Sequence, residues 1–249
     1  MELFNGERLD YVNDLLSLIQ KTDGLTFGTD ALLLAGYVAG KHKRGMEIGG
    51  GSGIISLLLL TREKVGQILA CEVQEEYCRL IERNAVLNSL ADRLEARHTD
   101  VRELSCGEEF DIVFSNPPYM KATSGALNKN DAKTVARHEI HGDIGELIRA
   151  GARALRYGGA MYVVWRPDRL TELIYAMHDS GIEAKRMTFV HADEKSEPSM
   201  VLVEGKKGAK PTLNVTRPLI IYKNSTHNEY SADMNYILEN GSFGAEYKR

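Results

Sequence analysis

Cysteine is scarce in this 249-residue chain, long apolar runs are absent, and both shortages narrow what the protein can be. The three cysteines, Cys71, Cys78 and Cys106, form an odd set without metal-ligand spacing. We therefore expect reduced thiols in a cytosol and no metal site. The longest apolar run, residues 54–60, is interrupted by Ser56 and is far too short to span a bilayer. Because acidic residues precede any apolar run at the N-terminus, neither a signal peptide nor membrane association is expected, and the predicted location is the cytoplasm.

An excess of positive charge is also missing, since the net charge is −4. This neither suggests nor excludes nucleic-acid binding, which depends on a local patch rather than on the sum. The clearest basic cluster is GKKGAK at residues 205–210. We interpret it as a solvated turn rather than a nucleic-acid-binding patch. The hydrophobic content of 43% is ordinary for a globular domain, and a chain of this length can bury a full core.

From residue 45 onward, short runs rich in β-branched residues alternate with helical patterns. The predicted strands are residues 46–50, 67–73, 94–100, 110–116, 159–165, 186–192 and 199–205, and the clearest predicted helices are residues 53–63, 74–88 and 145–157. This alternation predicts an α/β fold with a mostly parallel sheet covered on both faces. The last two strands are separated by so few residues that they should form an antiparallel hairpin.

The two ends of the chain follow a different pattern. Residues 1–44 are predicted to be an N-terminal extension, with a hairpin turning at Asp23-Gly24 and a helix capped by Thr29 or Asp30. Residues 45–210 form the main domain, and residues 211–249 form an appendage, one strand and one short helix, packed on the same domain. The polar segment 121–137 has no sustained period and is read as a loop.

A glycine-rich turn follows the first strand of the main domain, with the sequence EIGGGSGI at residues 47–54. Glycine lets the backbone turn sharply and lets a ligand approach, and the next helix offers free N–H groups. A dinucleotide fingerprint would require a small residue where Ile54 stands, and no Lys-Ser/Thr pair completes a phosphate-binding loop. The remaining pattern, an acidic residue followed by Gly49, Gly51 and Gly53, is typical of S-adenosylmethionine binding.

Three acidic residues close predicted strands at the carboxyl edge of the sheet, where open α/β folds bind ligands. Glu47 is predicted to help hold the cationic amino end of the donor, directly or through water. Glu72 is predicted to accept hydrogen bonds from the ribose hydroxyls, and Asp100 from the adenine amino group. A solvent-facing loop is the alternative for Asp100.

The fourth predicted strand ends in Asn116-Pro117-Pro118-Tyr119. Rigid prolines would hold the Asn116 side-chain oxygen and the Pro117 carbonyl toward one point, and two convergent acceptors bind an –NH2 group. Tyr119 would supply an aromatic face for a planar ring. Hydrogen bonds from both amine protons favour a pyramidal nitrogen whose lone pair can attack the methyl group, so the expected catalysis is positioning and electrostatic preorganisation.

These motifs resemble the amino-methyltransferases that carry an (N/D)PP(Y/F) motif on a Rossmann-like class I methyltransferase fold. More narrowly, the chain resembles the bacterial tRNA (adenine-N6)-methyltransferases, which modify the adenine beside the anticodon of a valine tRNA. The matching stretches are ERLD (7–10), LIQKTDGLTFGTDALLLAGYVA (18–39), GSGIISLLL (51–59), NPPYM (116–120), ARHE (136–139) and SMVLVEGKKG (199–208).

The resemblance implies a seven-stranded sheet, S-adenosylmethionine as donor, S-adenosylhomocysteine as product and tRNA as substrate. It implies donor-binding and catalytic roles for the positions already singled out, and places Thr29 in the part that closes over the donor's methionine end. One departure is Gly50, where such enzymes commonly carry Thr or Ser, and an extra glycine should loosen the turn. No obligate protein partner is evident from the sequence.

Two enzymatic alternatives remain open at this point, namely methylation of guanine N2 in ribosomal RNA and of a glutamine amide in a protein. Protein-glutamine methyltransferases carry a helical N-terminal domain, whereas only 44 residues precede Gly45 here. A non-catalytic scaffold is disfavoured because the NPPY motif is intact. His138 and His141 have metal-like spacing without an evident third ligand, which favours structural roles. Arg137, His138 and Glu139 are placed near the acceptor.

Overall fold

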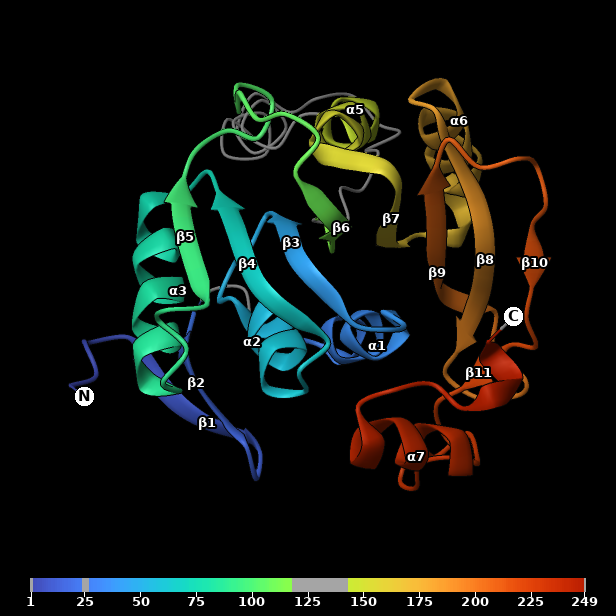
Figure 1. The fold of residues 1–249 in the computed structure, drawn as a ribbon. Helices are drawn as coiled ribbons and strands as arrows, with labels where there is room; N and C mark the ends of the chain where they lie inside the picture. Colours follow the sequence, from blue (N-terminus) through green and yellow to red (C-terminus); the bar gives the residue numbers. More distant parts are fainter. Residues whose placement is uncertain (1, 24–26, 118–142, 249) are drawn as a thin grey trace, which may run out of the picture.

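The main sheet is twisted and runs through the centre of the molecule, as the computed structural model shows for residues 2–23, 27–117 and 143–248 (Figure 1). Its strand order is β10-β8-β9-β7-β6-β3-β4-β5, with β11 paired to β8 off this path. The strands are β3 (His42–Ile48), β4 (Val65–Glu72), β5 (Leu94–His98), β6 (Phe110–Ser115), β7 (Leu155–Trp165), β8 (Ile182–His191), β9 (Pro198–Lys207), β10 (Asn214–Val215) and β11 (Leu219–Ile220).

Strands β3 to β7 are parallel, and β9 runs antiparallel between β7 and β8. The predicted α/β class, the mostly parallel sheet and the antiparallel hairpin are therefore confirmed. Among the described residues of the main sheet, seven strands have five or more residues, as predicted, and β10 and β11 add two residues each beside β8. Strands this short carry too little alternation to be recognised as pairing partners from sequence.

Helices cover both faces of the sheet. They are α1 (Thr29–Tyr37), α2 (Ile54–Thr61), α3 (Glu75–Leu87), α5 (Ile144–Ala154), α6 (Leu170–Asp179) and α7 (Ala232–Asn240), with 3-10 turns at Pro167–Arg169 and Ala245–Tyr247. Side chains of α1, α2, α3 and α7 share one core cluster on one face. Those of α5 and α6 pack with the opposite face in a second cluster. None of these helices is long and apolar enough to cross a membrane.

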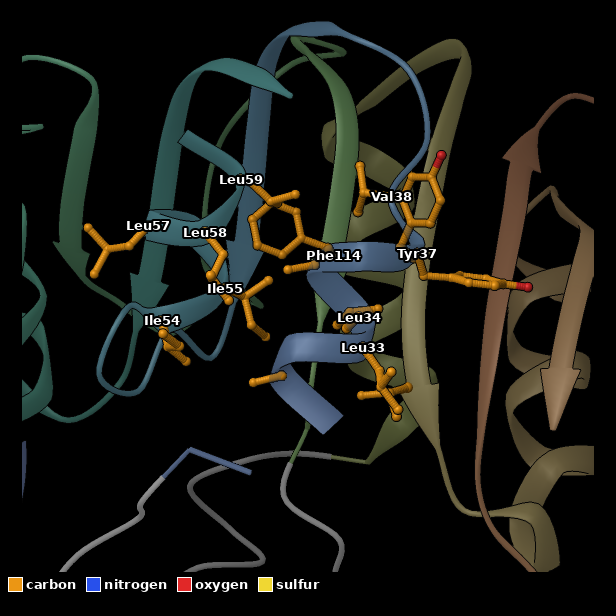
Figure 2. Close-up of a cluster of buried hydrophobic side chains, with 14 of the residues drawn as sticks. Leu33, Leu34, Tyr37, Val38, Ile54, Ile55, Leu57, Leu58, Leu59 and Phe114 are labelled. Atoms are coloured by element: carbon orange, nitrogen blue, oxygen red, sulfur yellow. The ribbon is translucent and has the colours of Figure 1, made fainter. Parts of the chain in front are cut away.

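The first core cluster fixes the two helices that begin at the candidate site. Figure 2 shows the buried side chains of α1 and α2 gathered around Phe114 of β6. Leu33, Leu34 and Leu57 are completely buried, and burying a leucine contributes about 1.5–3 kcal/mol. This packing holds the N-terminus of α1 and the glycine turn before α2 in fixed positions relative to the end of β6.

The N-terminal hairpin lies elsewhere than predicted. Strands β1 (Glu7–Asn13) and β2 (Leu16–Lys21) pair antiparallel, so the chain turns at residues 14–15 rather than at Asp23-Gly24. Gly24 lies outside the described residues, and Phe27 is not in a strand. The prediction missed β1 because none of its residues is fully buried, which leaves the sequence ERLDYVN without a clear apolar face.

The division of the chain into an N-terminal extension, a main domain from residue 45 and an appendage from residue 211 stays a prediction. Leu16 of β2, Ile68 of β4 and Met234 of α7 belong to one hydrophobic cluster. Both end segments therefore pack on the main sheet, as one cooperative core would require.

Candidate active site

The glycine turn between β3 and α2 depends on left-handed backbone conformations. The φ angles of Gly49, Gly51 and Gly53 are +74°, +54° and +82°, a region that residues with a side chain rarely adopt. A Cβ atom added at Gly49 or Gly51 would meet nothing within 4 Å. The turn therefore combines a glycine-only backbone with open space beside it, which is the shape expected of a ligand cradle.

Gly50 has a different reason to be glycine. Its φ is not positive, but an added Cβ would lie 2.7 Å from Cδ1 of Ile81, a fully buried side chain of α3. Contacts this short do not occur between carbon atoms without displacement. The departure from Thr or Ser at this position is thus explained by the close packing of α3 against the turn.

We expect Gly50→Ser to destabilise the protein by about 1–3 kcal/mol, because Ile81 must move to admit the new Cβ. In an Ile81→Val background the same substitution should cost clearly less, since Val lacks the Cδ1 atom. Urea unfolding of the four proteins measures this coupling directly. If the losses of unfolding free energy in the two single variants simply add in the double variant, Ile81 does not determine the residue at position 50.

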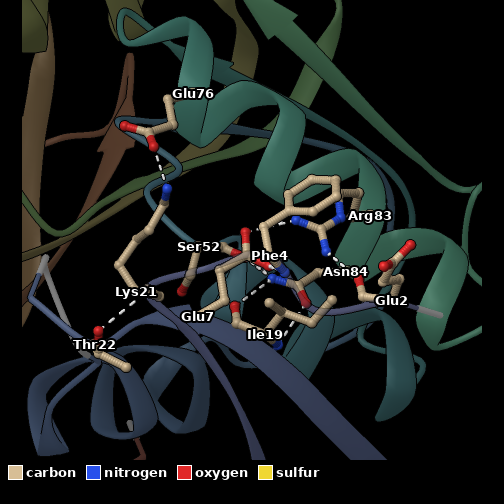
Figure 3. A network of polar contacts seen from close by, with 11 residues as sticks. Glu2, Phe4, Glu7, Ile19, Lys21, Thr22, Ser52, Glu76, Arg83 and Asn84 are labelled. Atoms are coloured by element: carbon tan, nitrogen blue, oxygen red, sulfur yellow. Dashed lines mark hydrogen bonds and ion pairs between the residues drawn. The ribbon is translucent and has the colours of Figure 1, made fainter.

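A buried asparagine ties the turn to the hairpin and to α3 (Figure 3). The Asn84 amide nitrogen donates to the carbonyls of Ser52 and Ile19, at 2.9 and 3.0 Å, and its oxygen accepts from the Ile19 N–H at 2.7 Å. Asn84 is fully buried, so each of these bonds replaces one that water would otherwise make. The sequence does not single out this residue, because it lies inside a helical pattern and its partners are far away in the chain.

Glu47 is buried at the end of β3, with 1% of its surface exposed. Its carboxyl group accepts a hydrogen bond from the Ser56 hydroxyl of α2. Burial raises the pKa of Glu47 to about 8, against the lowering effect of the Ser56 bond. The carboxyl is therefore largely protonated at neutral pH in this structure, and a cationic group brought beside it would favour its ionised form.

Glu72 closes β4 as predicted and is also buried. One carboxylate oxygen accepts from the N–H of Gly51 and the other from the N–H of Gln74, both at 2.9 Å. Each carboxylate oxygen has a second lone pair, so these bonds leave acceptor capacity for a ligand hydroxyl. Glu72 thus links the glycine turn to the start of α3 and fixes its own position.

Asp100 follows β5 and forms an ion pair with Arg102, which the sequence pattern does not predict. Both of its oxygens accept from Nε of Arg102, at 3.0 and 2.9 Å. This pairing holds the pKa of the Asp100 carboxyl below its usual range. Arg102 also reaches Glu146 of α5 at 3.0 Å, so Asp100 is part of a charge network that joins β5 to α5.

The end of β6 brings Asn116 and Pro117 to the same edge of the sheet. The Ser115 hydroxyl donates to the carbonyl of Ile48 at 2.8 Å, which ties β6 to the end of β3. The Asn116 amide nitrogen donates to the carboxylate of Asp30 in α1 at 2.9 Å. Thr29 is the first residue of α1, but the N-cap is Gly28 and no side chain caps the helix. The predicted capping role of Thr29 or Asp30 is wrong, because both residues lie inside the helix and Gly28 precedes it as the N-cap.

One cavity joins these elements. It lies between the ends of the strands and is lined by Ile48, Gly49, Cys71, Val73, Thr99, Asp100, Val101, Ser115, Pro117 and Leu147. The glycine turn, the residues after β5 and the motif after β6 therefore open onto the same space. A mostly apolar pocket with a few polar groups at its edge is typical of a site for a planar ring.

Several predicted residues lie outside the described part of the chain. These are Pro118 and Tyr119 of the motif, the loop 121–137, and Arg137, His138, Glu139 and His141. Within residues 2–23, 27–117 and 143–248, no group of three His, Cys, Asp or Glu side chains is arranged to hold a metal ion.

Solved structures of methyltransferases share this fold. A predicted O-methyltransferase, protein Atu636 from Agrobacterium tumefaciens, superimposes with a TM-score of 0.69 at 23% identity, covering 86% of this chain and 98% of that chain. P. horikoshii TYW2, solved in complex with MeSAdo, has a TM-score of 0.58 at 14% identity, covering 83% of this chain and 73% of that chain. The sheet and its helical layers are thus those of a class I methyltransferase.

The family is narrower than the fold. The model of the methyltransferase small domain matches residues 21–179, from the end of β2 through α6, and the chain belongs to this family. Two curated relatives are tRNA1(Val) (adenine(37)-N6)-methyltransferases. The one from Phocaeicola vulgatus is 28% identical over 72% of this chain and 76% of the relative. The one from Porphyromonas gingivalis is 27% identical over 82% of this chain and 80% of the relative.

Proposed function

We propose that this methyltransferase transfers a methyl group from S-adenosylmethionine to the N6 amino group of adenine 37 in a valine tRNA. The observation that carries the proposal is the shared cavity, whose lining includes Gly49 of the glycine turn, Asp100 after β5 and Pro117 of the motif after β6. The narrower assignment to tRNA is supported by the names of the curated relatives.

The residues at the glycine turn fit the proposed donor. Gly49 and Gly51 leave open space where side chains would otherwise stand, and the buried acid Glu47 could stabilise a cationic amino group. We assign the ribose hydroxyls to Glu72, the adenine end to Asp100, and the methionine end to Gly53 and Thr29. When bound, the donor supplies an electrophilic methyl group on a positively charged sulfur.

Asn116 is the proposed catalytic residue. An exocyclic amine conjugated to a purine is a poor nucleophile, because its lone pair is delocalised into the ring. An amide oxygen from Asn116 and the carbonyl of Pro117, each accepting one N–H bond, would favour the pyramidal nitrogen and aim its lone pair. Removing the proton after transfer requires no strong base, since the methylated cation is acidic. Stacking by Tyr119 stays a prediction.

An anticodon loop suits this arrangement. Position 37 lies in a single-stranded loop, so its base can enter a pocket without the cost of opening a duplex. Methylation of guanine N2 in ribosomal RNA and of a protein glutamine are not favoured, because the curated relatives described above are adenine methyltransferases. A cytoplasmic location and the absence of an obligate protein partner or metal stay predictions.

Nucleoside mass spectrometry of RNA from a strain that lacks this enzyme tests the proposal. After incubation with purified protein and S-adenosylmethionine, we expect N6-methyladenosine to increase in the tRNA fraction. N2-methylguanosine in ribosomal RNA, or methylation confined to protein extracts, would replace the proposal with one of the alternatives.

A further inference from the structure

The carboxylate of Asp30 lies between helix α1 and the catalytic motif. One of its oxygens accepts from the N–H of Ala31 at 2.9 Å. The other accepts from the side-chain nitrogen of Asn116 at 2.9 Å, across 86 positions of sequence. Both side chains are partly buried. A charge-assisted bond of this kind is stronger than one between neutral groups and restrains the amide it holds.

The bond determines which end of the Asn116 amide faces Asp30. An ionised carboxylate has only acceptors, so only the –NH2 end of Asn116 can bond to it. The Asn116 oxygen must then lie on the other side of the amide. In the part of the chain that the structure describes, that oxygen accepts no hydrogen bond. The bond to Asp30 therefore directs the oxygen end of the Asn116 amide away from the carboxylate.

The residue before α1 is adapted to this carboxylate. Gly28 has φ −112° and ψ −177°, an extended conformation that any residue adopts. An added Cβ there would lie 2.7 Å from Oδ1 of Asp30. Glycine at position 28 thus provides room for the carboxylate rather than backbone freedom.

The backbone leading into α1 is also held in place. The side-chain oxygen of Gln20, a buried residue of β2, accepts from the N–H of Phe27 at 2.8 Å. At the other end of the helix, the Lys64 ammonium donates to the carbonyls of Ala35, Gly36 and Val38 at 2.8–3.1 Å. Asp30 is therefore presented from a fixed helix, as a positioning group needs to be.

We propose that Asp30 is a positioning residue for methyl transfer: it holds the amide of Asn116 in the one orientation that presents the oxygen to the acceptor amine. The proposal rests on the catalytic role of Asn116 proposed above. Turned by 180° about its last bond, the amide would offer –NH2 to an –NH2 group, and two donors repel each other.

Two substitutions at position 30 separate this role from a structural one. In Asp30→Asn, the new oxygen can still accept from the Ala31 N–H, which leaves its –NH2 facing Asn116 and favours the reversed amide. In Asp30→Ala, Asn116 is unrestrained and samples both orientations. We expect kcat to fall about 100-fold in Asp30→Asn and about 10-fold in Asp30→Ala, with the Kd of S-adenosylmethionine within about threefold of wild type in both.

The decisive result is which of the two variants loses more kcat. Asparagine at position 30 can keep the side-chain bond to the Ala31 N–H, whereas alanine removes both bonds that the carboxylate makes. A merely structural role would therefore make Asp30→Ala the worse variant, which would overturn the proposal. A loss of donor affinity of tenfold or more with unchanged kcat would also overturn it, because Asp30 would then be a donor ligand. Asp14→Asn, in the exposed β1–β2 turn, is the matched charge control.

A second measurement needs no substrate and so remains valid if the proposed function fails. In the wild-type protein, one side-chain amide proton of Asn116 should resonate downfield in ¹H–¹⁵N spectra because it donates to a carboxylate, with the signal assigned by its loss in Asn116→Ala. Asp30→Ala should move this signal upfield, and Gly28→Ala should do so in part. An unchanged signal in Asp30→Ala would overturn the proposal even if the enzyme methylates tRNA as expected.

Discussion

Replacing Asn116 by alanine is expected to lower kcat for RNA methylation about 10³-fold, while the Kd of S-adenosylmethionine changes by less than about threefold. The amide oxygen is proposed to accept a bond that strengthens as the amine becomes pyramidal, and removing one such preorganised group typically costs 10²–10³ in rate. The donor cradle lies at the glycine turn and does not include this side chain. Single-turnover kinetics with radiolabelled donor, together with calorimetric donor titration, separate the two effects.

The control for this variant is Asn214→Ala, which removes an exposed amide of β10 far along the sheet from the motif. It should retain wild-type kcat. If Asn116→Ala kept kcat within about tenfold of wild type, Asn116 would be a structural residue at the end of β6 and not the proposed catalytic group.

The second large effect is expected from Glu47→Gln and concerns stability as a function of pH. The pKa of Glu47 is raised from 4.5 to about 8 in the folded protein, so the folded state holds a proton that the unfolded state releases. The stabilisation from that proton is fully present below about pH 4.5 and is lost as the pH rises to about 8. Its full size is on the order of 4 kcal/mol.

Glutamine has the shape of the protonated acid and does not ionise. The difference in unfolding free energy, Glu47→Gln minus wild type, should therefore increase by about this amount as the pH rises from 4.5 to 8.5. Urea unfolding at several pH values in this range measures the difference. Glu239→Gln, an exposed change of the same charge on α7, should show no such trend. A pH-independent difference for Glu47→Gln would mean that Glu47 is ionised in the folded protein throughout.

Most of the framework could be predicted from sequence because it follows local periodicity. The strands that end at Ile48, Glu72 and Ser115 are short runs of buried residues, and the acidic and amide residues that close them could be placed at one sheet edge. Helix ends follow less directly from periodicity: the pattern predicts a helix through residue 157, but α5 ends at Ala154 and β7 begins at Leu155. Helix α6 was not singled out.

The parts that sequence could not supply are contacts between distant residues. The Asp30–Asn116 bond, the Asn84 bonds to Ile19 and the placement of Ile81 where a Cβ of residue 50 would lie each relate segments that no local pattern connects. Arg102 was missed as the partner of Asp100 because its pairing depends on how the chain turns after β5. These contacts decide side-chain orientation and ionisation, which composition and spacing leave open.

The most direct test of the account uses a synthetic anticodon stem-loop and a donor with a deuterated methyl group. With adenine at position 37, mass spectrometry should find the label in N6-methyladenosine alone. With purine riboside at that position, which keeps the ring but lacks the 6-amino group, labelling should disappear. Equal labelling of both RNAs, or label on a guanine, would contradict the claim that this site grips an adenine amine and methylates it.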